Sequence, residues 1–307
     1  MRALLIANPK ATATSQRIRD LLVRTFSGAV DPELVETAHR GHAAELARRA
    51  AEEKFDVVMA LGGDGTVNET VNGLLAHGPS AELPALAVVP IGSTNVFARA
   101  LGLPGDPVGA TRRVLDALRA GRYRSIGLGL ADDRYFTFCA GLGLDAEVIR
   151  AVERRRRAGG NASPALYVGM ALRQFFRTDR RHPALTVERP GRPPIDGVFL
   201  SFIANTAPWT YIRGYPVNPS PRAHFAGGLD LFGMRSLQVL PVLSAVAGML
   251  RPGGRPVMGR HVVNVHDAEE ITVRAQRPMA FQLDGDYLGE RRQITFRSVP
   301  KAIRIVI

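Results

Sequence analysis

Residues 62–69 read Gly62-Gly63-Asp64-Gly65-Thr66-Val67-Asn68-Glu69. They follow an apolar run over 56–61 that predicts a buried strand, and they open a predicted helix over 66–76. Glycines let the backbone turn tightly and approach a ligand. The N-terminus of a helix offers free N–H groups and a partial positive charge, which suit a phosphate. The stretch therefore predicts a phosphate-binding loop between a strand and a helix.

Asp64 is the unusual residue of this loop, because a carboxylate beside phosphates repels them unless a metal ion bridges the two or a hydroxyl is bound. It indicates a metal–nucleotide site or a contact to ribose. The loop has no Walker lysine, so it is not a P-loop. The structural alternative is a plain strand–turn–helix connection in which Asp64 accepts hydrogen bonds from turn amides. The eight-residue string in its strand–helix context favours the nucleotide site.

Strand and helix signals alternate on both sides of this loop. Strands are expected over 3–7, 34–38, 56–61 and 85–89, and helices over 15–26, 42–54, 66–76 and 107–120. Repeated βα units imply a parallel sheet with helices on both faces. We therefore expect a Rossmann-like α/β domain over 1–124.

The sequence pattern changes after about Gly121, where strand-like runs separated by Gly and Pro dominate. These runs cover 135–140, 185–188, 197–204, 270–275, 279–283 and 293–297, with helices expected over 145–157, 164–177 and 237–250. The pattern is typical of an antiparallel sandwich or open barrel. The strand expected over 302–307 is almost wholly apolar, which is typical of a strand buried on both faces. We expect a β-rich antiparallel domain over 125–299, with 300–307 returning to the first domain.

Composition narrows the class of protein further. The 307 residues suit two domains. The net charge of +12 comes almost wholly from arginine, whose planar fork suits phosphate and carboxylate partners. A single cysteine, Cys139, excludes an intrachain disulfide and makes a reducing compartment, the cytoplasm, the expectation. We find no signal-peptide pattern and no apolar run of ~18–20 residues, so any membrane contact is expected to be peripheral.

Three stretches resemble the diacylglycerol kinase catalytic-domain family, which includes bacterial lipid kinases and the sphingosine and ceramide kinases. They are Asn8-Pro9-Lys10, Gly62 to Glu69, and Pro90-Ile91-Gly92-Ser93-Thr94-Asn95 with Phe97-Ala98-Arg99. Weaker matches are Gly141 to Ala146, Gly228-Leu229-Asp230 and Asp284-Gly285-Asp286. Together they span nearly the whole chain in family order.

The resemblance implies an active site in the cleft between the α/β domain and the β-rich domain, with ATP as co-substrate and Mg²⁺ as cofactor. The residues expected to bind the nucleotide are Asn8, Pro9, Lys10, Thr12, Thr37, Gly62, Gly63, Asp64, Gly65, Thr66, Asn68, Glu69 and Thr94. They lie at or after the carboxyl ends of predicted parallel strands, where such sheets bind ligands. For Asn8 and Thr94, capping of a turn or helix is an equal alternative.

Phosphoryl transfer to an alcohol also needs an acceptor for the hydroxyl proton. By resemblance, Asp284 is the general base and Asp286 its acidic neighbour, and Asp64 and Asp286 are the metal ligands. The alternative is a hairpin turn with solvated aspartates. The chain departs from the family in having Asp286 where a glutamate is usual, Val96 where an aspartate is frequent, and Gly227 and Gly228 where a structural Mg²⁺ has acidic ligands.

We therefore predict an ATP-dependent lipid kinase, with diacylglycerol as the family's default acceptor and phosphatidylglycerol, a sphingoid base and ceramide as open alternatives. Two basic clusters lie at the ends of predicted helices: residues 154–157, and Arg177, Arg180, Arg181 and His182. Each is either a solvated helix end or a contact to an anionic membrane. We favour the membrane contact, because a lipid kinase must meet its substrate at the bilayer. No motif supports nucleic-acid binding, and a homodimer is left open. The rival functions are NAD kinase, which shares the Gly-Gly-Asp-Gly-Thr string, and an inactive lipid- or nucleotide-binding regulator. Gly141 to Ala146 also matches a dinucleotide fingerprint, which we interpret as a structural turn.

Overall fold

The computed structural model describes residues 1–9, 22–157, 164–212, 214–251 and 254–307. The chain forms two compact units. Unit 1 comprises Met1–Leu128 and Pro300–Ile307, and unit 2 comprises Gly129–Val299. The change between units therefore falls four residues after the end of the expected first domain at 124.

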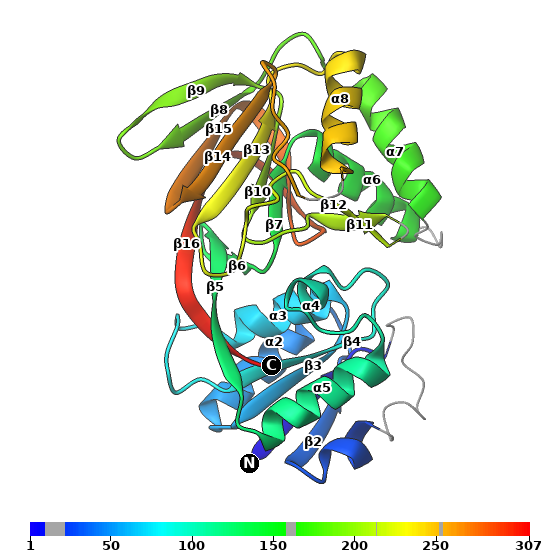
Figure 1. The fold of residues 1–307 in the computed structure, drawn as a ribbon, viewed down its shortest axis with the longest axis vertical. Helices are drawn as coiled ribbons and strands as arrows, with labels where there is room; N and C mark the ends of the chain where they lie inside the picture. Colours follow the sequence, from blue (N-terminus) through cyan, green and yellow to red (C-terminus); the bar gives the residue numbers. More distant parts are fainter. Residues whose placement is uncertain (10–21, 158–163, 213, 252–253) are drawn as a thin grey trace. The chain divides into compact units, whose positions relative to one another are not determined.

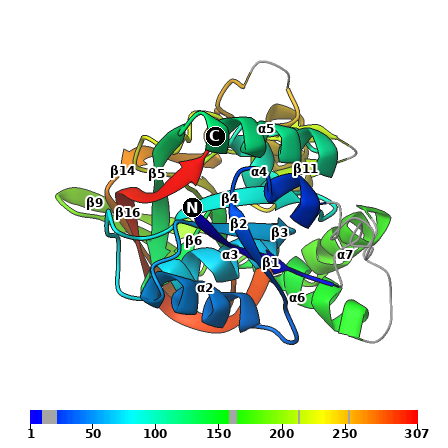
Figure 2. The same cartoon turned by 90° about the horizontal axis from the view of Figure 1, so that it is seen from below.

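Unit 1 is built on a parallel sheet of β1 (Arg2–Ala7), β2 (Asp31–Glu36), β3 (Val57–Gly62) and β4 (Ala85–Pro90) in the order β2-β1-β3-β4. Every residue of β3 and β4 is buried, whereas β2 at the edge alternates between exposed and half-buried positions. Helices α2 (His42–Glu52) and α3 (Asp64–Leu74) cover one face of the sheet, and α5 (Pro107–Arg119) covers the other (Figure 2). This is the Rossmann-like arrangement that the alternating pattern predicted.

Local sequence explains where these helices begin. Asp106 caps α5 by accepting a hydrogen bond from Gly109 N at 2.7 Å, and Pro107 occupies the first turn. The short helix α4 (Val96–Ala100) follows Asn95, which has a left-handed backbone. The helix expected over 15–26 lies largely outside the described residues; its last turn is helical, with Leu22 and Phe26 buried.

Unit 2 is an antiparallel sheet in the order β14-β13-β10-β7-β15-β16, with β8 and β9 extending from β15. Its main core is a cluster of buried apolar side chains that includes Phe136, Phe281 and Phe296. The strands of this sheet are β5 (Tyr123–Ala131), β6 (Arg134–Phe136), β7 (Cys139–Leu142), β8 (Leu185–Arg189), β9 (Arg192–Val198), β10 (Leu200–Ala204), β13 (Leu229–Met234), β14 (Val262–Ala268), β15 (Glu270–Leu283) and β16 (Asp286–Val306). Strands β11 (Thr210–Ile212) and β12 (Tyr215–Val217) form a separate two-stranded sheet.

Three helices flank this sheet in unit 2: α6 (Leu144–Arg157), α7 (Pro164–Arg177) and α8 (Val239–Met249) (Figure 1). Ala245 and Met249 of α8 belong to a second apolar cluster, and Phe175 of α7 packs against the same cluster. Within the described residues, we find no helix with the length and apolarity needed to cross a membrane.

Several expected strand boundaries are wrong. The run over 135–140 is two strands, β6 and β7, separated at Thr137 and Phe138. The runs over 270–275 and 279–283 form the single strand β15, whose register shifts between Arg274 and Met279. The runs over 293–297 and 302–307 also form one strand, β16, which leaves unit 2 and pairs in unit 1 with β4, placing Ile305 opposite Leu86.

Candidate functional site

Asp64 sits in the first turn of α3 and joins two loops of unit 1. Its Oδ2 accepts from Val96 N and its Oδ1 from Phe97 N, each at 3.0 Å. The carboxylate therefore caps the N-terminus of α4, so the amides that it satisfies belong to the loop after β4. Mg²⁺ is usually held by one or two carboxylates together with substrate phosphates and water. A single carboxylate at a glycine-rich helix N-terminus fits that requirement.

The two loops touch through their glycines. A Cβ on Gly92 would lie 2.7 Å from Gly63 Cα and 2.7 Å from Asn95 Oδ1, which is too close for any side chain. A Cβ on Gly62 would lie 2.5 Å from Thr66 Oγ1. In contrast, a Cβ on Gly65 would meet nothing within 4 Å. Close packing therefore requires glycine at positions 62 and 92, whereas a side chain at position 65 would meet open space.

Asn95 shapes the loop after β4. Its Oδ1 accepts from Gly92 N at 3.0 Å and its Nδ2 donates to Gly92 O at 2.8 Å. These bonds close a tight turn that leaves Asn95 with a φ of 50° and holds Thr94 half-buried. Asn8, just after β1, donates from Nδ2 to Thr66 Oγ1 at 3.3 Å. The ends of β1, β3 and β4 thus meet at one edge of the sheet.

Other predicted nucleotide residues take part in the fold around this edge. Glu69 Oε1 accepts from Gly41 N at 2.9 Å, which ties α3 to the start of α2. Asn68 is only 2% exposed, and its oxygens accept from Asn72 Nδ2. Thr37 follows β2 and donates its N–H to Ala7 O at 2.9 Å. Pro9 is half-buried after β1, and Lys10 and Thr12 lie outside the described residues.

Asp284 is buried in the hairpin between β15 and β16, with a φ of 48°. Its Oδ2 accepts from Thr137 N at 2.7 Å and from Thr137 Oγ1 at 2.8 Å. Its Oδ1 accepts from Phe138 N at 3.0 Å and Cys139 N at 3.1 Å. Burial raises the pKa of Asp284 above its ordinary value, although these four hydrogen bonds oppose the rise. The carboxylate therefore holds the β6–β7 turn against the hairpin.

A second buried carboxylate, Asp145, stands next to this hairpin. Gln282 Nε2 donates to Asp145 Oδ2 at 2.7 Å, and Gln282 Oε1 accepts from Gly285 N at 2.9 Å. Gly141 makes room, because a Cβ there would lie 2.2 Å from Asp145 Oδ2. Burial raises the pKa of Asp145 to about 7.

Sequence reasoning missed Asp145, because Gly141 to Ala146 was interpreted only as a structural turn. It does form the turn between β7 and α6, with Gly143 at a φ of 91°. The available signal was a carboxylate inside an apolar, glycine-rich turn, where an unsolvated charge needs a partner.

Asp286, two residues after Asp284, begins β16 and is half-buried. Elsewhere in unit 2, Asp230 accepts from His266 Nδ1 at 2.7 Å and Asp267 N at 3.0 Å. A Cβ on Gly228 would lie 2.7 Å from Ala268 O, so an acidic side chain would not fit there without a backbone shift. The described residues contain no group of three or more His, Cys, Asp or Glu side chains placed to hold a metal ion.

The fold is shared with a diacylglycerol kinase and an NAD kinase of known structure. A diacylglycerol kinase from Bacillus anthracis superimposes with a TM-score of 0.72 at 19% identity, covering 99% of this chain and 96% of that one. An NAD kinase from Archaeoglobus fulgidus superimposes with a TM-score of 0.54 at 12% identity, covering 100% and 94%. At these identities the likeness shows the fold alone.

The sequence comparisons point to diacylglycerol kinases. The profile of the diacylglycerol kinase catalytic domain matches residues 2–129. A diacylglycerol kinase of Bacillus subtilis is 26% identical over 94% of this chain and 90% of its own length. One from Staphylococcus aureus is 36% identical over 44% of this chain and 41% of its own length. The chain is thus similar to diacylglycerol kinases, through the catalytic-domain profile over residues 2–129 and through curated relatives of that name.

Proposed function

We propose that this protein transfers the γ-phosphoryl group of ATP to a lipid hydroxyl, with diacylglycerol as acceptor and phosphatidic acid as product. The observation that carries the proposal is the loop at the start of α3, in a segment that matches the family's catalytic domain. There Gly65 leaves open space beside the helix N-terminus, and Asp64 stands in its first turn. Such an end of a helix binds phosphate through free N–H groups.

Each residue of this edge has a separate task in the proposed reaction. The backbone of Gly63 to Thr66 receives the phosphates, and the Gly63–Gly92 contact keeps the two loops in register. Asp64, which caps α4, would hold Mg²⁺. Asp286 of unit 2 is the second proposed metal ligand. When bound, the metal neutralises charge on the phosphoryl oxygens. Asn8 and Thr94 complete the rim around the phosphates.

Asp284 is the proposed proton acceptor. A raised pKa makes the carboxylate of Asp284 a stronger base than an ordinary aspartate. Three of these four hydrogen bonds come from backbone amides and one comes from the Thr137 hydroxyl, whose hydrogen can turn to another acceptor. The substrate hydroxyl therefore takes the place of Thr137 Oγ1 on Asp284 Oδ2. Asp286 is the competing candidate, because it is less buried.

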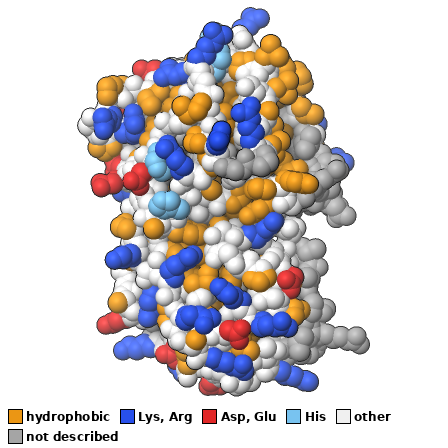
Figure 3. Space-filling model, in the orientation of Figure 1, with side chains coloured by type: hydrophobic (Ala, Val, Ile, Leu, Met, Phe, Trp, Pro, Cys, Tyr) orange, Lys and Arg blue, Asp and Glu red, His pale blue; other side chains and the backbone are white. Residues whose placement is uncertain are grey.

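Membrane contact in this proposal involves unit 2. Helix α8 carries no charged residue, and its outer face exposes Leu240 at 78% and Leu243 at 58%. Figure 3 shows apolar side chains gathered over α8. Helix α7 exposes Phe176 at 66%, and Arg180 lies over its ring at 5.5 Å. Apolar side chains bordered by arginine are typical of a surface that enters the interface of an anionic bilayer.

The test is transfer of labelled γ-phosphate from Mg²⁺-ATP to a lipid panel in mixed micelles, with NAD as one acceptor. Labelled phosphatidic acid, the product of transfer to diacylglycerol, is expected. Asp284→Asn should lower turnover by roughly 10²–10⁴-fold and leave ATP binding intact, the usual effect of removing a general base. A loss of that size in Asp286→Asn, with Asp284→Asn near normal, would move the base to Asp286. Labelled NAD would instead make the protein an NAD kinase, and ATP binding without any product would favour a regulator.

A further inference from the structure

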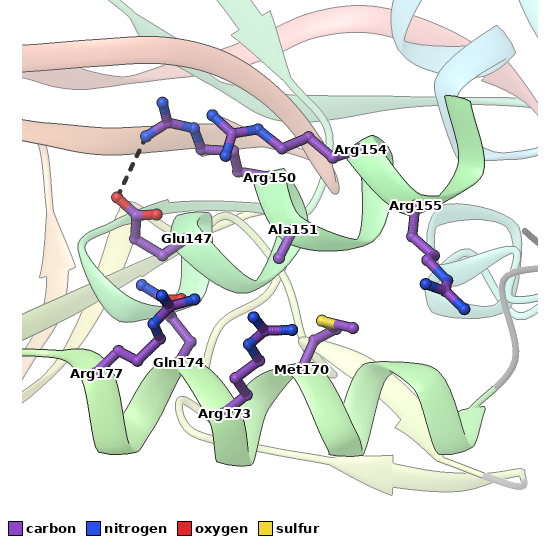
Figure 4. Close-up of a pocket in the computed structure, with 9 residues that line it drawn as sticks. All are labelled: Glu147, Arg150, Ala151, Arg154, Arg155, Met170, Arg173, Gln174 and Arg177. Atoms are coloured by element: carbon purple, nitrogen blue, oxygen red, sulfur yellow. Dashed lines mark ion pairs between the residues drawn. The ribbon is translucent and has the colours of Figure 1, made fainter. Parts of the chain in front are cut away.

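A cavity of about 360 Å³ lies between α6 and α7 in unit 2, apart from the residues assigned to catalysis above. Helix α6 lines it with Arg150, Arg154 and Arg155, and α7 lines it with Arg173 and Arg177. In Figure 4, Arg173 and Arg177 extend from α7 toward α6, and Arg155 extends from α6 toward α7. Five arginines therefore line one small cavity, although the side chains of Arg150 and Arg154 extend along the side of α6 that faces away from α7 (Figure 4).

The negative charge beside this cavity is much smaller. Arg150 pairs with Glu290 at 2.9 Å and with Glu147 at 3.7 Å, and Glu147 is the one carboxylate in the lining. Within the part of the chain that the structure describes, the other four arginines have no carboxylate within ion-pair distance. The cavity thus has a large excess of positive charge.

The spacing of these arginines adds a cost to folding. Arg150 and Arg154 are four residues apart on α6, and Arg173 and Arg177 are four residues apart on α7. Like charges at that spacing destabilise a helix, and here both pairs belong to the lining of one cavity. A bound anion would convert this repulsion into attraction.

We propose that this cavity is a binding site for a phosphate monoester. Arginine forks bind phosphate oxygens bidentately, and a dianion balances more of the excess charge than a diester does. The arginine stems with Ala151 and Met170 supply apolar lining for the group that carries the phosphate. Phosphatidic acid and soluble phosphate esters share this chemistry, and exposed Leu172 and Phe176 on α7 favour the lipid as source.

Binding is tested with the full chain by co-sedimentation with phosphatidylcholine vesicles that contain phosphatidic acid. A parallel set contains phosphatidylglycerol at the same total charge. Calorimetric titration with glycerol 3-phosphate is the soluble arm. The cavity variant is Arg173→Gln/Arg177→Gln, and the control is Arg112→Gln/Arg113→Gln on the exposed side of α5, which removes the same charge elsewhere.

The cavity variant is expected to bind phosphatidic acid vesicles at least tenfold more weakly than wild type, with the control within twofold. The wild type should also prefer phosphatidic acid to phosphatidylglycerol. Loss of glycerol 3-phosphate binding alone would assign the site to soluble esters. Equal losses in both variants, or no loss in either probe, would overturn the proposal.

Two further variants guard against a folding artefact. Arg154→Gln/Arg155→Gln removes charge from the opposite helix and should give the same loss. Arg173→Lys/Arg177→Lys keeps the charge but removes the fork, and should give an intermediate affinity. Circular dichroism melting checks that each variant is folded. Because the readout is binding without ATP, its result is independent of whether the proposed kinase activity is found.

Discussion

Two carboxylates in this protein stabilise the fold and also have a role in the proposed reaction. Asp64 and Asp284 each accept backbone amides from a segment distant in sequence, and each is also a candidate for the site. Loss of activity in a variant of either residue therefore has two explanations. Stability measured beside activity separates them.

Replacement of Asp284 by alanine should destabilise the protein. It removes the acceptor of three buried N–H groups and one hydroxyl, and a buried donor left unsatisfied costs about 1–3 kcal/mol. We expect the free energy of unfolding to fall by at least ~3 kcal/mol, measured by urea denaturation. Asp284→Asn keeps one oxygen and should lose less, and half-buried Asp286→Ala should lose least. An unchanged urea midpoint for Asp284→Ala would contradict the structural role.

Asp145 should make stability depend on pH. Burial raises the pKa of Asp145 to about 7, against about 3.9 in an unfolded chain. The folded protein then holds a proton that the unfolded chain releases, so this contribution is full below pH ~4 and is lost as pH rises through about 7. The loss is on the order of 4 kcal/mol.

Asp145→Asn keeps an acceptor for Gln282 but cannot ionise. Relative to wild type, the variant should gain stability as pH rises from 5 to 8, in urea unfolding at both values. A difference between the two proteins that stays constant over this range would mean that Asp145 does not titrate there.

At the scale of elements, the site is a meeting of strand ends and helix starts. Contact between Gly63 and Gly92 is needed to bring the loops after β3 and β4 together, and Asp64 then caps α4 across that contact. Gly65 differs from its neighbours, because its missing side chain serves no packing contact. It is therefore the residue that can separate fold from ligand binding.

Gly65→Ala should leave the fold intact and weaken ATP binding. Alanine is favoured over glycine in a helix by about 1 kcal/mol, so the melting temperature should stay or rise. The added methyl group occupies the open space at the helix N-terminus, and the affinity for Mg²⁺-ATP should fall at least tenfold in calorimetry. Gly169→Ala in α7, which also meets nothing within 4 Å, is the matched control. Unchanged ATP affinity in Gly65→Ala would remove this loop from the nucleotide site.

On the scale of the whole molecule, the chain crosses between its units and returns. Residues 300–307 complete unit 1 after the whole of unit 2 has been traversed. Ala302, Ile303, Ile305 and Val306 of this return are buried, and Ile305 lies opposite Leu86 of β4. Unit 1 therefore depends on the end of β16.

A fragment of residues 1–128 should not unfold cooperatively. Burial of an Ile or Val side chain contributes about 1.5–3 kcal/mol, so the loss of 300–307 approaches the 5–15 kcal/mol that stabilises a typical domain. The same fragment with residues 300–307 joined through a flexible linker should regain a sigmoidal urea transition. Near-ultraviolet circular dichroism is the readout. Cooperative unfolding of 1–128 alone would show that the return strand is dispensable.

Much of this organisation could be predicted from the sequence. Alternating apolar runs and helix signals predicted the parallel sheet of unit 1, because a strand buried on both faces must be continuously apolar, as β3 and β4 are. The string from Gly62 to Glu69 predicted the strand–loop–helix connection. The strand boundaries of unit 2 were predicted less well. Long antiparallel strands with register shifts, such as β15, break the alternation on which such predictions rest.

The sequence by itself determined the class of fold, the resemblance to diacylglycerol kinases and the glycine-rich loop, since these depend on local periodicity and on motifs within a few residues. Only the tertiary structure decided the partners of the carboxylates. It joined Asp64 to α4, enclosed Asp284 in the β6–β7 turn and buried Asp145 beside Gln282. It also brought the arginines of α6 and α7 to one cavity. Burial and pairing depend on residues far apart in the chain, and spacing along a sequence does not encode those contacts.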